Sequence, residues 1–103
     1  MRLIFATCSP DEAEKLVDTL LEERLVACAN MIPGVRSHYW WEGEINRDDE
    51  VVLFLETREG RVDAAVTRLR ELHSYDVPKI IVIDPDQCEP TYSAWIESVT
   101  GPS

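Results

Sequence analysis

The sequence predicts an α+β domain with an antiparallel sheet, and three observations lead to this fold class. Two segments carry apolar residues three and four apart, the spacing of one buried helical face. Four other segments are rich in β-branched and aromatic residues, as strands are. The segments follow one another as β-α-β-β-α-β with a short helix at the end, which is the ferredoxin-like pattern. A chain of 103 residues is expected to form one such domain over residues 1–103.

The first strand is expected at residues 2–8, RLIFATC, and a helix is expected directly after it. Ser9 is predicted to cap this helix, Pro10 to take its first position, and Glu12 to complete a capping box. The predicted buried face of the helix comprises Ala13, Leu16, Val17, Leu20, Leu21 and Leu25.

A long hairpin is expected next. Residues 25–45 are prone to form a strand, and Pro33 with Gly34 in the middle predicts a bend or bulge. Glu42 and Gly43 give the turn signal, and the returning strand, EVVLFLET, is expected from Glu50.

The remaining elements are a helix, a strand and a short helix. Apolar residues at helical spacing run from Val62 to Leu72, and Pro78 requires that helix to end before it. The continuous apolar run in KIIVIDP predicts a strand buried on both faces. The last helix is expected in EPTYSAWIESV, with the following residues facing inward: Tyr92, Trp95, Ile96 and Val99.

Aromatic residues in the segment SHYWWEGEI are expected on both faces of one strand. Alternation places Tyr39 and Trp41 on one face and Trp40 on the other. In the ferredoxin-like pattern the helices cover only one face of the sheet, so a monomer would leave large aromatics in water. Each such side chain buries on the order of 150–250 Å². The sequence therefore predicts that another subunit covers the open face.

The charge balance excludes two classes of partner. Ten basic and 20 acidic residues give a net charge of -10, which argues against nucleic acid and anionic membranes. Cations fit this charge, although solubility alone also explains it. The chain has no apolar run of about 20 residues and no signal peptide, so a cytoplasmic location is expected.

The sequence contains few residues or motifs that indicate catalysis or metal binding. No nucleophile motif, glycine-rich phosphate loop or H-E-x-x-H motif occurs, so an enzyme is not expected. Cys8 precedes the predicted helix start, where the helix dipole is expected to lower the thiol pKa and favour a soft cation such as Cu(I). His73 either interacts with the end of the second helix or binds a metal or ligand. Cys28 is expected to be buried and Cys88 exposed, and three cysteines do not make a disulfide framework.

Several longer segments carry a family resemblance: EERLVACANMIPGVRSHYWWEGEI, LET, LHSYDVPKI and YSAWI, within a match from about Ile4 to Ile96. They closely resemble the CutA family, the divalent-cation tolerance proteins. The resemblance implies a ferredoxin-like subunit in a homotrimer similar to the PII signalling proteins, and a link to copper and other divalent cations. It also implies that the hairpin strands extend each sheet into a neighbour. The predicted interface residues are Trp40, Trp41 and Trp95.

Four positions depart from the family pattern. Glu44 and Glu56 stand where relatives usually have Lys, Ser74 where they have Pro, and Lys79 where they have Glu. The copper site described for one family member uses a cysteine before the first loop and two adjacent histidines. In this chain Thr7 and Leu72 occupy two of those three places, and His73 matches the third.

Three functional hypotheses remain at this stage. The first is a cytosolic homotrimer that needs no cofactor, binds copper or other divalent or soft cations, and contributes to metal tolerance. Its predicted metal ligands are Cys8, His73 and Glu56. The alternative is a PII-like trimer that binds a small ligand or a partner protein in its inter-subunit clefts. The predicted cleft residues are Tyr39, Glu42, Glu56, His73 and Tyr75. The third hypothesis is a mainly structural assembly module.

Overall fold

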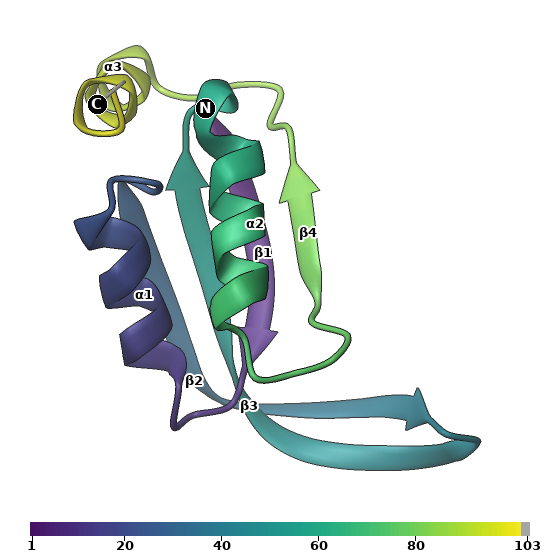
Figure 1. Ribbon diagram of the computed structural model, residues 1–103. Coiled ribbons are helices and arrows are strands. Elements are labelled where there is room, and N and C mark those ends of the chain that lie inside the picture. Colours follow the sequence, from purple (N-terminus) through teal and green to yellow (C-terminus); the bar gives the residue numbers. More distant parts are fainter. Residues whose placement is uncertain (102–103) are drawn as a thin grey trace.

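The computed structural model describes residues 1–101; Pro102 and Ser103, the last two residues of the expected domain, lie outside the described residues. The elements follow the predicted order (Figure 1). They are β1 (Arg2–Cys8), α1 (Ala13–Glu22), β2 (Cys28–Trp41), β3 (Glu44–Thr57), a 3-10 turn η1 (Glu59–Arg61), α2 (Val62–Leu72), β4 (Ile80–Ile83) and α3 (Pro90–Val99).

The four strands form one antiparallel sheet in the order β2-β3-β1-β4. Helices α1 and α2 lie side by side on one face of it, and α3 lies across one end (Figure 1). This arrangement confirms the predicted α+β, ferredoxin-like fold. Among residues 1–101 the two edge strands are β2, which pairs only with β3, and β4, which pairs only with β1.

The core lies between the sheet and the two long helices. Alternate residues of β1 and β3 point to the helices, and Ile4, Leu53 and Leu55 are fully buried there. They pack with the apolar stripes of the helices, which include Leu20 and Leu69. Removing each large apolar side chain from water contributes roughly 1.5–3 kcal/mol, so this layer is the main source of stability.

Helix α1 begins later than predicted. Its first residue is Ala13, and residues 10–12 form a turn instead of the first helical turn. The Ser9 hydroxyl donates to the Glu12 carboxylate (2.8 Å), so it does not cap the helix. The Glu12 carboxylate also accepts from the Ser9 N–H (3.2 Å), which is half of the predicted capping box. Of the predicted buried face, Leu21 is exposed.

The hairpin of β2 and β3 is longer than predicted and bends sharply. The predicted irregularity is confirmed between Ile32 and Val35, where Gly34 has a φ of +75°. Glu42 (φ 51°) and Gly43 (φ 80°) form the predicted turn, whose positive φ values match the twist of paired strands. β3 starts at Glu44 instead of Glu50, because residues 44–49 pair with β2 although they are mostly polar. Beyond the bulge the hairpin forms an arm, residues 35–50, that points away from the helices (Figure 1).

Two expectations about burial are wrong within one chain. β4 is an edge strand that pairs only with β1, and Ile81, Val82 and Ile83 are exposed, whereas burial on both faces was predicted. In α3 only Ile96 is fully buried, while Trp95 is exposed. The physical reason is the same for both: each element has neighbours on one side only. Within residues 1–101 no helix is long and apolar enough to cross a membrane.

Candidate binding groove

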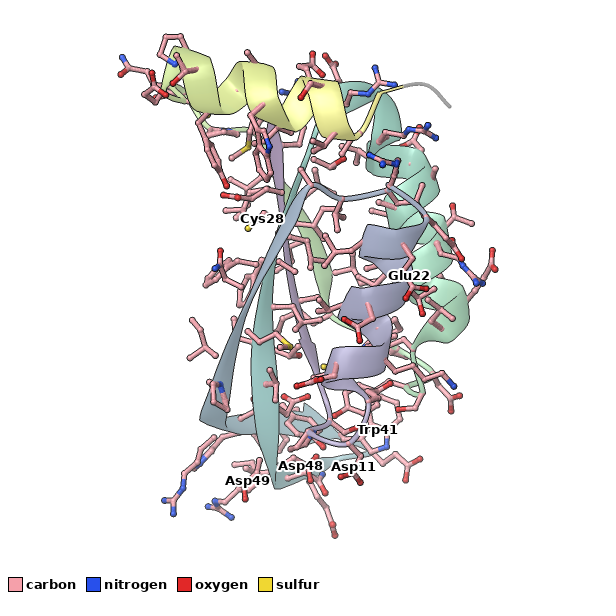
Figure 2. All side chains as sticks on the ribbon, turned by 90° about the vertical axis from the view of Figure 1, so that its left-hand side faces the viewer. Asp11, Glu22, Cys28, Trp41, Asp48 and Asp49 are labelled. Carbon is pink, nitrogen blue, oxygen red and sulfur yellow. The ribbon has the colours of Figure 1, made fainter. Side chains whose placement is uncertain are left out.

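The sheet face opposite α1 and α2 is apolar and uncovered. The strand register places Phe5, Phe54 and Ile81 on this open face, and the two phenylalanine rings stack with centroids 5.4 Å apart. Figure 2 views the sheet nearly edge-on and shows Cys28 on the side away from the two long helices. This open face is the surface that, by the sequence prediction, another subunit covers.

A groove of about 700 Å³ runs between the arm and the body of the protein. One wall is the arm, including Tyr39 and Trp41. The other wall combines the open face, at Phe5, with the loop between α2 and β4, at Tyr75. Figure 2 shows Trp41 and Asp48 at the arm end of the molecule. The bend at the bulge therefore creates the groove by folding the hairpin away from the sheet.

Two tyrosine–carboxylate pairs line this groove. The Tyr75 hydroxyl donates a hydrogen bond to the Glu50 carboxylate (2.8 Å). Glu50 is buried, with only 6% of its surface exposed. Burial and the neighbouring Glu50 carboxylate raise the pKa of Tyr75 above its ordinary value. On the arm, the Tyr39 hydroxyl donates to Asp48, and this hydrogen bond raises the pKa of Tyr39. Both phenols therefore stay protonated at neutral pH and act as donors.

His73 lies behind the groove and orients Tyr75. Its Nε2 lies 2.8 Å from the carbonyl oxygen of Thr7, and its Nδ1 accepts the N–H of Tyr75 (3.1 Å). Because a carbonyl can only accept, this network assigns the proton to Nε2. The imidazole also packs on the Tyr75 ring, with centroids 4.6 Å apart. Both ring nitrogens are thus engaged with the backbone, and a metal would have to displace one of these hydrogen bonds.

Glu12 joins the turn before α1 to the loop that carries Tyr75. Its carboxylate accepts from the Ser74 N–H (3.0 Å) and hydroxyl (2.7 Å), in addition to the two Ser9 donors. Partial burial raises the pKa of Glu12, but the hydrogen bonds from Ser74 and Ser9 outweigh it, so the pKa lies below its ordinary value.

Replacing Glu12 by Ala is expected to lower the free energy of unfolding by about 1–3 kcal/mol at pH 7. A carboxylate whose pKa is lower in the folded chain than in the unfolded chain stabilises the folded state at pH values above its unfolded-state pKa of about 4.5. This stabilisation is lost as the pH falls through the lower pKa of the folded state. The difference between wild type and Glu12→Ala in urea unfolding should therefore shrink toward zero in acid. Glu14→Ala, at an exposed position in the first turn of α1, is the control. An equal loss in both variants would contradict the role of Glu12.

The prediction that the helix dipole lowers the pKa of the Cys8 thiol is wrong. Cys8 is fully buried, and burial followed by the charges of Glu12 and Glu50 raises the pKa of its thiol to about 11. Since α1 begins only at Ala13, no helix N-terminus adjoins the sulfur to stabilise a thiolate. At neutral pH the thiol is protonated and serves as part of the core.

One chain does not bring all three predicted metal ligands together. His73 lies beside the end of β1 that carries Cys8, since its Nε2 is 2.8 Å from the Thr7 carbonyl oxygen, but Glu56 lies elsewhere. Cys8 pairs with Val51, whereas Glu56 pairs with Leu3 and Cys28 five residues further along β3. At roughly 3.3 Å per residue that separation is about 17 Å. Glu56 instead accepts a hydrogen bond from the Tyr92 hydroxyl of α3. Among residues 1–101 no group of three or more His, Cys, Asp or Glu side chains is placed to hold a metal ion.

The structure also sorts the predicted cleft residues. Tyr39 and Tyr75 line the groove, His73 supports Tyr75, Glu42 forms the hairpin turn, and Glu56 lies toward the α3 end. Three lining carboxylates were not predicted from the sequence: Asp48, Glu50 and Asp76. Glu50 already stood at the start of the expected strand, and period-two alternation would have added Asp48 had the polar segment from Glu44 been recognised as part of that strand.

Comparisons with known proteins place this fold and its residues in a family. The family model for the CutA1 divalent ion tolerance protein matches residues 2–99. The chain belongs to the CutA family. It is 49% identical over 96 residues to the divalent-cation tolerance protein CutA of Pyrococcus horikoshii, covering 91% of this chain and 93% of that relative. It is 35% identical to the chloroplastic protein CutA 1 of Oryza sativa, of which it spans 56%.

Solved CutA structures share the fold over nearly the whole chain. The CutA1 crystal structure from Pyrococcus horikoshii has a TM-score of 0.93 and 44% identity, covering 99% of this chain and 100% of that one. A structure described as the PII-like protein CutA from Nostoc sp. PCC 7120 in apo form has a TM-score of 0.94 and 30% identity, with 98% of each chain covered. Family membership and the subunit fold implied by the resemblance are therefore confirmed.

Glu56 and Lys79, the two positions at which a reversal of charge relative to the family was expected from the sequence, do not face each other within the chain. Glu56 bonds to Tyr92, whereas the Lys79 ammonium lies over the Phe5 ring, 5.3 Å from its centroid. They mark opposite ends of the open face, because Glu56 pairs with Leu3 at the start of β1 and Lys79 directly precedes β4, whose first residue pairs with Ala6. The reversal therefore does not preserve an ion pair inside one subunit.

Proposed function

We propose that this CutA-family protein acts as a cytoplasmic homotrimer in divalent-cation tolerance, binding copper or other divalent or soft cations without catalysing a reaction. The observation that carries the proposal is the family match over residues 2–99. Relatives in Pyrococcus horikoshii and Pectobacterium atrosepticum bear the name divalent-cation tolerance protein CutA. The net charge of -10 also favours cations over anions near the surface.

The uncovered surface of the chain supports the homotrimer. Trp40, on the arm, is 72% exposed, and Trp41 is 45% exposed. The open face and the free edges of β2 and β4 add apolar surface and unpaired backbone groups, both of which favour association. Trp95 on α3 is also exposed and stays a predicted interface residue. The PII-like fold supports the same assembly.

Assembly also bears on metal binding. A metal at Cys8, His73 or Glu56 would need further ligands from a neighbouring subunit or from water, because one chain does not bring the three together. At Cys8 the cation must also compete with a proton held by a thiol whose pKa is about 11 instead of 9.0. This lowers the thiolate fraction at neutral pH by about 100-fold.

A calorimetric titration with Cu²⁺, repeated with Zn²⁺, tests the location of the metal. At pH 7 we expect Cys8→Ser to bind within about twofold of wild type, because the Cys8 thiol is protonated and buried. Cys88→Ser is the control for a thiol outside the core. A loss of binding in Cys8→Ser that grows with increasing pH would instead locate the metal at Cys8. No binding of either ion to the wild type would contradict the cation-binding proposal.

The groove favours a second candidate function, in which the trimer binds a small ligand or partner protein as PII-like proteins do by analogy of fold. Its supporting observation is the cavity of about 700 Å³ beside Tyr39 and Tyr75. Calorimetric titration with a panel of nucleotides separates this candidate from the first, since the two differ in which titrant binds. A flat response to metals and nucleotides alike would favour a structural assembly module.

A further inference from the structure

We propose that the groove binds a small organic cation, such as an alkylammonium or guanidinium ion. This inference rests on the second candidate function above, ligand binding in the groove, and names its ligand class. It follows from three features of the groove: its size, its aromatic walls, and lining carboxylates that form no ion pair among the described residues, of which Asp48 and Glu50 share one face of the arm.

The size and the walls of the groove suit such a ligand. Small-molecule sites are commonly about 300–1,000 Å³ and mostly apolar, and this groove measures about 700 Å³. Aromatic rings free to meet a ligand reach it from two directions: Tyr39 and Trp41 from the arm, and Tyr75 from the loop before β4. Phe5, on the open face, already carries the Lys79 ammonium. Aromatic faces attract cations through the ring quadrupole. The chain already shows this attraction, because Lys79 lies over Phe5.

The charges of the groove favour a cation as well. Asp48 and Glu50 are two residues apart on β3, so their side chains share one face of the arm, and both line the groove. Each accepts a hydrogen bond from a tyrosine hydroxyl. Within residues 1–101 neither carboxylate forms an ion pair. A buried carboxylate such as Glu50 is costly without a counter-charge, and a bound cation would supply one.

Anions and metal ions fit the groove less well. Three basic residues belong to its lining: Arg36, His38 and Lys79. The Lys79 ammonium lies over Phe5, and alternation places Arg36 and His38 on the arm face opposite Asp48 and Glu50. A metal ion would find too few ligands, since no cluster of three donors is present among residues 1–101. An organic cation needs only a carboxylate and aromatic surface, which the groove offers together.

The test titrates the intact protein, with EDTA present, by calorimetry and tryptophan fluorescence. The probes are n-butylammonium chloride and tetramethylammonium chloride; sodium chloride and the neutral isostere n-butanol are the controls. We expect saturable binding of n-butylammonium at one ion per subunit, and n-butanol at least about tenfold weaker. Glu50→Gln should weaken n-butylammonium by about tenfold or more. The amide oxygen of Gln can still accept from Tyr75, so the loop should keep its place.

Asp49→Asn is the matched control, because Asp49 lies between Asp48 and Glu50 in the sequence but on the opposite face of the arm. Its affinity for n-butylammonium should stay within about twofold of wild type. Equal binding of n-butanol and n-butylammonium, or unchanged binding in Glu50→Gln, would overturn the proposal. A trimer that shows no saturable binding of n-butylammonium would also overturn the proposal, because it would mean, for example, that a neighbouring subunit fills the groove. Light scattering and the metal titration test the proposed trimer and its cation binding separately. A failure of the proposed function can therefore be distinguished from a failure of the organic-cation proposal.

Discussion

Replacing Trp40 and Trp41 together by Ser is expected to convert the protein from a trimer to a monomer at micromolar concentration. The two side chains lie on opposite faces of the arm and are 72% and 45% exposed in one chain. Burying that surface against a neighbour contributes about 2–4 kcal/mol per side chain, at about 25 cal/mol per Å². This burial energy is lost in every subunit of the trimer. The total loss should therefore exceed what the remaining contacts between subunits can offset.

Light scattering measures this result directly. The wild type should give a particle three times the mass of one 11.8-kDa chain, and the double variant a particle of one chain. Leu21→Ser is the matched control, because Leu21 is an exposed apolar residue on α1, on the helical side of the sheet. It should remain trimeric. A wild-type particle of about 12 kDa would contradict the assembly proposal.

The melting temperature of the wild type is expected to fall by about 8 °C on a hundredfold dilution. When a trimer unfolds to three free chains, this dilution lowers the free energy of unfolding by about 5 kcal per mole of trimer. The unfolding entropy of about 2.1 cal/mol/K per residue, summed over three chains of 103 residues, converts that value to the shift in temperature. The prediction assumes that the uncovered apolar face leaves the single chain with little stability of its own.

Circular dichroism at both concentrations, with the same heating rate, tests the coupling between folding and assembly. The double variant Trp40→Ser, Trp41→Ser supplies the internal control, since a monomer should melt at a temperature independent of concentration. A wild-type melting temperature that does not change over the hundredfold range would show that each subunit folds without its neighbours.

Much of the fold was determined by the sequence alone, because its signals are local. The helical stripes depend on residues three and four apart, and they predicted the core positions Leu20 and Leu69. The bulge at Pro33–Gly34 and the turn at Glu42–Gly43 follow from the backbone angles that these residues permit. The family resemblance, carried by longer segments, anticipated the same topology and was confirmed over residues 2–99.

Only the tertiary structure decided the character of the candidate site. The burial of Cys8, the two hydrogen bonds of His73 and the pairing of Tyr75 with Glu50 all join segments that are far apart in the sequence. A thiol pKa depends on what surrounds the sulfur, and a histidine's availability depends on what its nitrogens already bind. Neither property is encoded in the neighbouring residues. The groove exists for the same reason: it forms where the bent arm approaches the open face and the loop before β4, and that approach is a property of the folded chain.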